Sequence, residues 1–346
     1  MTVTIAVAGS GLAELTCAWL LALRGHRVRL RPRPAHGSRP LLLGEDTLAL
    51  LGSLWGAGPS GESHRLTHRH VRWAPGPPDP PLAQSATVVD GALLCRQLLD
   101  RLATHHPDTV GPDGPDTPRW TVTADPPPGH PGEHWTAGRR HLLAGEAPLA
   151  PGQDDTMARL DRTDLAWLHL TPLGNGRALL QAMVPGPVAR PTHLLGRLLT
   201  ASALAPRLLH PPETAVALPA APRLHPFPAA APAAHTPGTL LVGAGAIRYD
   251  PLSGTGTAQA LRTAILAAAV IGSAAAGTDP GPLCAHYTTR LRTAFHEHLA
   301  TCARLYPQAF PDPSWQHELN ACGAVTFTYL AAARRSANRY DRPPRR

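Results

Sequence analysis

The chain has 346 residues, of which 43% are hydrophobic, and it carries 32 Lys and Arg residues against 24 Asp and Glu residues. This length is enough for one or two ordinary hydrophobic cores. No apolar run reaches about 18 residues, so we expect no membrane-spanning helix. The formal net charge of +8 comes from arginines spread along the chain, and only 334–346 is locally basic. We therefore expect no nucleic-acid partner.

The cysteines are five in number and widely spaced, which indicates reduced thiols in a cytoplasmic protein rather than a disulfide framework. The first predicted strand begins at Thr2 with no charged segment before it, so we expect no signal peptide. The cysteines are Cys17, Cys95, Cys284, Cys302 and Cys322.

The N-terminal segment combines a strand, a glycine turn, a helix and a second strand. Residues 2–8 form a short β-branched apolar run, and the turn glycines Gly9 and Gly11 follow it directly. The helical pattern after the turn ends at Gly25, and 26–30 is typical of a second strand. This order within one short segment is typical of a dinucleotide-binding unit.

A second glycine motif follows the apolar strand at 240–242 and leads into a helix rich in Ala and Leu. A glycine-rich turn before a helix leaves backbone N–H groups unpaired at the positive end of the helix dipole. Such a turn holds an electron-rich group, either a phosphate or the pyrimidine edge of a flavin. The residues of this motif are Gly243, Asp250, Pro251, Gly254, Thr255 and Gly256.

Together the two motifs resemble those of FAD-dependent monooxygenases and tryptophan-halogenase-like flavoproteins. The phrase YDPLSGTG at 249–256, followed by AQALRTAI, is most similar to the monooxygenases that hydroxylate tryptophan during maturation of the quinone cofactor of quinohemoprotein amine dehydrogenases. The resemblance covers nearly the whole chain. It implies an α/β fold: a glutathione-reductase-like FAD-binding Rossmann domain with an inserted mixed β-sheet substrate domain and C-terminal helices.

The resemblance also implies a division of the chain. The first part of the FAD-binding domain is expected at 1–150, with an excursion at about 60–84 into the substrate sheet. The substrate sheet is expected at 151–236 and the second part of the FAD-binding domain at 237–275. A C-terminal helical region with a basic tail is expected at 276–346. Helices are predicted at 92–103, 193–204, 282–306 and 315–329, and a hairpin at 164–185 around Asn175-Gly176.

Two further landmarks carry expected FAD contacts. Glu45 lies where the family begins a helix close to the cofactor; alternatively, Glu45 or Asp46 only caps that helix. Gly138 lies in WTAGR, which stands where the family has D-A-T-G-R at the strand end that closes the first half of the domain. The resemblance thus implies FAD contacts at Gly9, Gly11, Glu45, Gly138, Gly243, Asp250, Pro251, Gly254, Thr255 and Gly256.

Four positions depart from the family pattern. Glu14 replaces the third glycine of the first motif, where a side chain crowds the helix and brings negative charge near a pyrophosphate. Pro32 stands where an acidic residue binds the adenosine ribose, Gly91 replaces Arg or Gln, and Ala244 replaces the Asp of the G-D motif. The last three are lost polar contacts at about 1 kcal/mol each, enough to weaken FAD binding by about two decades.

The function that the resemblance implies is FAD-dependent monooxygenation. A flavin C4a-hydroperoxide would hydroxylate an aromatic, tryptophan-like substrate that is peptide- or carrier-bound, with a flavin reductase or partner enzyme supplying electrons. Related halogenases use an active-site lysine, and this chain has no lysine, so halogenation by that route is disfavoured. The alternative is a catalytically degenerate protein that acts as a binding or escort partner in a biosynthetic pathway.

Neither a general base nor a metal site follows clearly from the sequence. His296 and Arg248 are the only candidates for a base, because they lie near the segments that should flank the flavin. His64 and His68 could share a helix face, as zinc ligands do, but no carboxylate or cysteine completes a ligand set. We expect no metal.

Overall fold

The computed structural model describes residues 2–33, 40–73, 79–109, 117–126, 135–225, 228–311 and 313–324. The basic tail predicted at 334–346 and the end of the helix predicted at 315–329 lie outside the described residues.

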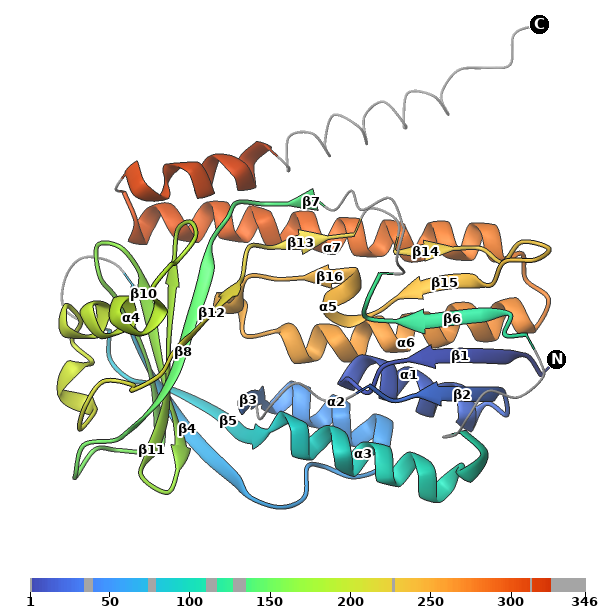
Figure 1. Cartoon of the computed structure of the whole chain (residues 1–346), viewed down its shortest axis with the longest axis horizontal. Helices are drawn as coiled ribbons and strands as arrows, with labels where there is room; N and C mark the ends of the chain where they lie inside the picture. Colours follow the sequence, from blue (N-terminus) through green and yellow to red (C-terminus); the bar gives the residue numbers. More distant parts are fainter. Residues whose placement is uncertain are drawn as a thin grey trace, which may run out of the picture.

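A five-stranded sheet forms the first layer and confirms the predicted Rossmann unit. Four of its strands are parallel because the connections between them include helices. The apolar residues of the first strand, Ile5 and Val7, are fully buried in it. The sheet order is β14 (Ala229–Ala230), β15 (Gly238–Leu241), β6 (Trp120–Thr123), β1 (Thr4–Ala8) and β2 (Arg27–Arg31), as Figure 1 shows at the right.

An eight-stranded mixed sheet lies at the other end of the molecule. Its order is β12 (Val216–Pro219), β8 (His141–Pro148), β11 (Arg177–Val184), β10 (Trp167–Gly174), β9 (Met157–Arg162), β4 (Ser63–Arg72), β5 (Leu82–Asp90) and β3 (Pro40–Gly44).

The hairpin predicted at 164–185 is confirmed as β10 and β11, with Asn175 at a φ of 53° in the turn. The excursion predicted at about 60–84 corresponds to β4 and the start of β5. This sheet also includes β8, which lies before residue 151 in the chain. His64 and His68 lie on strand β4, not on a helix, because this segment pairs with β5 over most of its length.

A small third sheet corrects one sequence assignment. β7 (Trp135–Thr136), β13 (Arg223–Leu224) and β16 (Ile247–Arg248) form an antiparallel three-stranded sheet. WTAGR was expected at the strand end that closes the first half of the FAD-binding domain, and its strand β7 belongs to this small sheet instead of the five-stranded one. The last strand of the five-stranded sheet before this segment is β6. It pairs with both β1 and β15 and is followed by Ala124.

The helices predicted at 92–103, 193–204 and 282–306 are present, but the second ends earlier than predicted, at Thr200. Asp90 caps α3 by accepting the N–H groups of Ala92 and Leu93 at 2.7 and 3.0 Å. The helix predicted at 282–306 extends to Ala309 and includes Pro307. The helices are α1 (Leu12–Leu23), α2 (Glu45–Trp55), α3 (Gly91–His105), α4 (Pro191–Thr200), α5 (Gly243–Ala246), α6 (Gly256–Ala275) and α7 (Pro280–Ala309), followed by 313–324; the 3₁₀ turns are Pro107–Thr109, Ala205–Arg207 and η3 (Pro251–Ser253).

Helix α7 connects the two large sheets (Figure 1). Near its start, the Tyr287 hydroxyl donates to the Leu241 carbonyl of β15 at 2.8 Å. Near its end, the Trp167 indole of β10 donates to the Tyr306 hydroxyl at 3.0 Å. Helix α6 is apolar and long enough to cross a membrane, but it contributes ten buried residues to the protein core and packs against α1 and α7. We interpret α6 as a core helix.

Candidate functional site

The two predicted glycine turns lie side by side at the carboxyl ends of β1 and β15. Gly9 has a φ of 132°, which only glycine adopts readily, and Gly11 is the N-cap of α1. The N–H of Gly243 donates to the Thr263 hydroxyl at 2.9 Å, and a Cβ on Gly243 would lie 3.0 Å from that of Ala13. The structure therefore brings both motifs to the carboxyl ends of the parallel strands. In open α/β sheets ligands bind in a crevice at this position, and this region is called the crevice here.

The turn before α6 is the open part of this crevice. The Asp250 side chain accepts the Leu252 N–H at 2.9 Å, and Gly254 follows in the left-handed conformation with a φ of 62°. Thr255 is the N-cap of α6, and no side chain of the described residues caps this helix. A Cβ on Gly254 or Gly256 would meet nothing within 4 Å among the described residues. Both glycines are exposed, so the turn before α6 is open at its surface among the described residues.

A buried ionic network holds Asp250 in place. Arg140 Nε lies 3.4 Å from Asp250 Oδ2 and 3.6 Å from Glu318 Oε2, and all three side chains are at most 1% exposed. The Tyr306 hydroxyl lies 3.0 and 2.9 Å from the two Asp250 oxygens. Burial opposes the charge of Arg140, but the Asp250 carboxylate raises its pKa, so the guanidinium stays charged.

The same network accounts for Gly138. The Glu318 side chain accepts the Arg139 N–H at 2.8 Å, and a Cβ on Gly138 would overlap the Glu318 carboxylate. Gly138 therefore contacts the helix at 313–324, which itself lies against the Arg140 network. This network could not be predicted from the sequence, because its members are spread along the chain from Arg140 to Glu318.

His298 supports the same turn from α7. Its Nε2 accepts the Asp250 N–H at 2.8 Å, and its ring stacks on Tyr249 with centroids 4.4 Å apart. Burial lowers the pKa of His298 from 6.5 to about 4. Protonation would remove the acceptor, so the turn requires the neutral ring.

We expect stability to fall on acidification because of this histidine. The unfolded chain takes up a proton at His298 below pH 6.5, whereas the fold resists protonation down to about pH 4. The stabilisation is therefore complete above pH 6.5 and lost as the pH falls toward 4, by about 2 kcal/mol between pH 7 and 5. The unfolding free energy of His298→Gln, measured in urea at several pH values, should lack this part of the pH dependence. The exposed His193→Gln control should keep it, and equal curves for wild type and His298→Gln would contradict the assignment.

The eight-stranded sheet contributes a polar patch to its face on the flavin-domain side. His169 pairs across the strands with Gln181 and with Leu160, and Leu160 belongs to the main core. Burial, and next the charge of Arg69, lower the pKa of His169 to about 4, so the ring is neutral. Arg69 Nε is buried and finds no acceptor among the described residues.

The remaining predicted site residues lie elsewhere. Glu45 is exposed in the first turn of α2; Gly44 is the N-cap, and neither Glu45 nor Asp46 makes a capping hydrogen bond within the described residues. Arg248 donates to the Ala221 carbonyl at 3.2 and 3.0 Å and so fastens β16. His296 is 5% exposed, and its ring lies near those of Phe295 and Trp135, with centroids 5.8 and 6.1 Å away.

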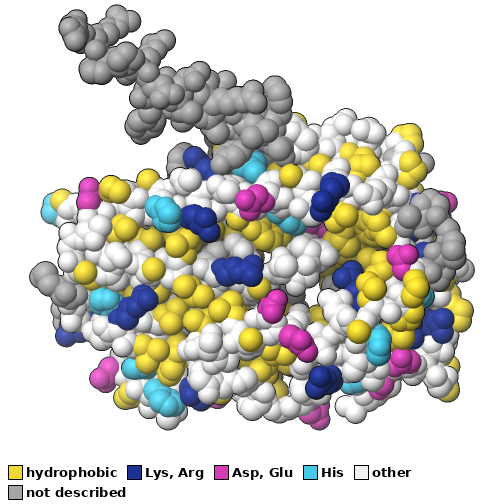
Figure 2. Space-filling view, turned by 180° about the vertical axis from the view of Figure 1, so that it is seen from behind, with side chains coloured by type: hydrophobic (Ala, Val, Ile, Leu, Met, Phe, Trp, Pro, Cys, Tyr) yellow, Lys and Arg dark blue, Asp and Glu magenta, His cyan; other side chains and the backbone are white. Residues whose placement is uncertain are grey.

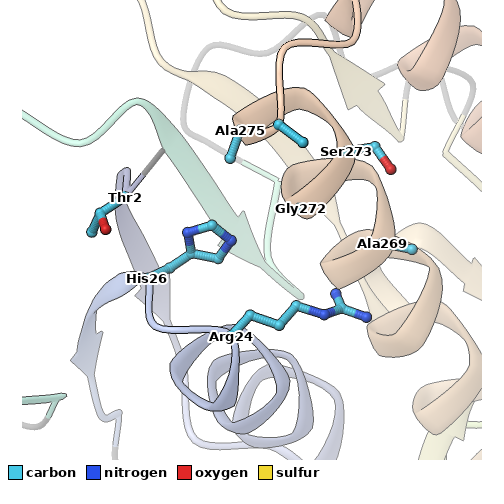
Figure 3. A pocket seen from close by; sticks show the side chains of 8 residues that line it. Thr2, Arg24, His26, Ala269, Gly272, Ser273 and Ala275 are labelled. Carbon is cyan, nitrogen blue, oxygen red and sulfur yellow. The ribbon is translucent and has the colours of Figure 1, made fainter.

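Two surface features do not belong to this crevice. A hollow of about 610 Å³ lies between the loop after α1 and the end of α6, and Figure 3 shows Arg24 and His26 on one side and Gly272 and Ser273 on the other. It is at the end of β1 opposite the glycine turn.

Figure 2 shows arginine side chains dispersed among acidic and apolar ones on the face it presents, without a basic stripe. Among the described residues, no group of three His, Cys, Asp or Glu side chains could hold a metal ion.

Comparison with known proteins identifies the fold. No protein-family model matches the sequence, and no curated protein matches it. Solved structures of FAD-dependent monooxygenases and halogenases do match in fold, as the resemblance predicted. The peptidyl tryptophan dihydroxylase QhpG, essential for tryptophylquinone cofactor biogenesis, is 18% identical with a TM-score of 0.75, over 92% of this chain and 79% of that one.

Two other structures show the same architecture. The flavin-dependent halogenase CmlS is 16% identical with a TM-score of 0.70, over 92% of this chain and 68% of that one. Klebsiella pneumoniae HpxO, in complex with FAD and uric acid, is 15% identical with a TM-score of 0.64, over 93% and 96% of the two chains. At these identities the likeness establishes the fold alone.

The crevice fits the two ends of FAD unequally. The open turn before α6 offers backbone donors and free space, which suits the ring edge of a flavin. The turn before α1 offers little space, because the Glu14 carboxylate lies against both Gly9 and Gly11.

Proposed function

We propose that this protein is a flavin-dependent monooxygenase that hydroxylates an aromatic substrate. The observation that carries the proposal is the open, uncapped N-terminus of α6 behind the Gly254–Gly256 turn, within the fold of the FAD-dependent monooxygenases. A bound flavin would supply oxygen activation, which no side chain of the chain provides by itself. A protein that had lost flavin chemistry would have no need to keep this turn open.

The chain's own residues then have separable tasks. The N-terminus of α6 stabilises negative charge on the adjacent ring edge with backbone donors alone. Arg140 and Asp250 hold the turn in its conformation through the buried network. Arg69 and His169 present a cation and a neutral imidazole to the substrate side of the crevice.

The finer substrate assignment rests on analogy. QhpG is a peptidyl tryptophan dihydroxylase, and we infer that this protein acts on a tryptophan-like ring that is peptide- or carrier-bound. We further infer a cytoplasmic enzyme that receives electrons from a flavin reductase or a partner enzyme.

With a flavin, a flavin reductant, oxygen and the aromatic substrate, we expect the product to gain oxygen mass. Chloride or bromide should leave that mass unchanged, because no lysine is present to intercept hypohalite. Mass spectrometry of the product measures both. A halogenated product would refute the lysine argument. If the folded protein binds none of riboflavin, FMN and FAD, the proposed function is refuted and an escort role is favoured.

A further inference from the structure

The pyrophosphate end of the crevice is filled by a side chain of the protein itself. Glu14 lies on α1 at the third-glycine position of the motif, and its side chain folds back over the turn. Glu14 Oε1 would lie 2.5 Å from a Cβ on Gly9, and Oε2 would lie 2.7 Å from a Cβ on Gly11. The Glu14 residue is only 5% exposed.

The carboxyl group also stands at the helix N-terminus where a phosphate would bind. It lies in the first turn of α1, where the helix dipole favours negative charge. It accepts the N–H of Ala124, at the carboxyl end of β6, at 3.1 Å. Burial raises the pKa of Glu14, so the obstruction comes from the volume of the side chain as well as from its charge. A phosphate at this turn would have to displace the Glu14 side chain from these contacts.

The adenosine end of the crevice is obstructed as well. Arg33 follows β2 and Asp125 follows β6, and the two form an ion pair. Because β1 lies between β2 and β6, the pair crosses the end of β1, where an adenosine would lie. Both side chains are more than half exposed, so the pair is weak and can open. Glu14 is therefore the main obstacle.

The flavin end, by contrast, stays open at Gly254 and Gly256. Resting on the proposed flavin function, we propose that the protein selects a flavin without the adenosine diphosphate part, riboflavin above FMN and both above FAD. Glu14 closes the pyrophosphate site from within and sets this order.

The test is direct binding. Wild type, Glu14→Gly and the isosteric Glu14→Gln are titrated with riboflavin, FMN and FAD by flavin fluorescence and calorimetry, with circular dichroism and thermal melting to confirm folding. Wild type should bind riboflavin at least about tenfold more tightly than FAD. Glu14→Gly should raise FAD affinity at least about tenfold and leave riboflavin affinity unchanged. Glu14→Gln, which removes the charge but keeps the volume, should fall between, and Arg33→Gln should change FAD affinity by less than Glu14→Gly.

The outcomes separate the two proposals. Tighter binding of FAD than of riboflavin by wild type overturns the selection of a shorter flavin and leaves the flavin function standing. An unchanged FAD-to-riboflavin ratio in Glu14→Gly overturns the role of Glu14 in the same way. Absence of binding of all three flavins to both wild type and Glu14→Gly overturns both proposals. Should Glu14→Gly fail to fold, Glu14→Ala gives the same readout, because it also empties the turn while keeping a good helix former.

Discussion

Replacing Arg140 by Met is expected to destabilise the fold by about 3–5 kcal/mol, because it leaves two buried carboxylates without their cation. Asp250 and Glu318 are both at most 1% exposed, and each has an oxygen within 4 Å of the Arg140 Nε atom. The guanidinium also donates to the Ala137 carbonyl at 3.3 Å, which Met cannot replace. Urea unfolding measures the loss.

The neighbouring Arg139→Met variant is the matched control. The Arg139 side chain is exposed, and the residue contacts Glu318 through its backbone N–H, which the substitution keeps. The variant should therefore lose no more than about 0.5 kcal/mol of unfolding free energy. Removing all three charges together, by Arg140→Met with Asp250→Asn and Glu318→Gln, should recover part of the stability, since no bare charge then remains buried. Equal stability of the Arg140→Met and Arg139→Met variants would show that the network is not important for the fold.

The parts of the fold that were predicted correctly depend on residues that are close together in the sequence. The strand at 2–8 and the turn at Gly9 and Gly11 follow from β-branched residues and glycines next to one another in the chain. The hairpin at Asn175 follows from a residue pair that tolerates positive φ. Each of these signals is complete within about ten residues.

The assignments that differ in the structure depend on pairing partners. WTAGR at 135–139 matches the family's letters, but its strand pairs with β13 and not with β1. His64 and His68 fit helical spacing equally well, until β5 and β9 provide partners for a strand. Neither choice can be made from the segment itself.

The positions of the glycine turns could be predicted from the sequence, but the contacts of the charged side chains around them could not. The sequence indicated that Glu14 crowds the first turn, but not that its carboxylate takes the Ala124 N–H. The partners of Asp250 lie at Arg140, His298 and Tyr306, and only the packing of α7 brings them together. Spacing carries no information about such contacts.

Replacing Gly256 by Val should lower flavin affinity by about 100-fold or more while leaving the fold intact. No described atom lies within 4 Å of a Cβ at Gly256, and its backbone is helical, so a side chain there meets only what occupies the crevice. Gly254→Val should abolish binding and activity too, but its φ of 62° adds about 1–2 kcal/mol of backbone strain. Gly256→Val therefore separates ligand exclusion from strain.

Gly196 on α4 provides the control for this experiment. It is likewise helical and has no described atom within 4 Å of a Cβ, but its helix α4 packs on the eight-stranded sheet, away from α6. Gly196→Val should leave riboflavin titrations and turnover unchanged, and thermal melting should show all three variants folded. If Gly256→Val and Gly254→Val both bind riboflavin as wild type does, the ring of a flavin does not approach the N-terminus of α6. The charge-stabilising role of that helix end would then be wrong, whatever ligand the neighbouring Glu14 turn admits.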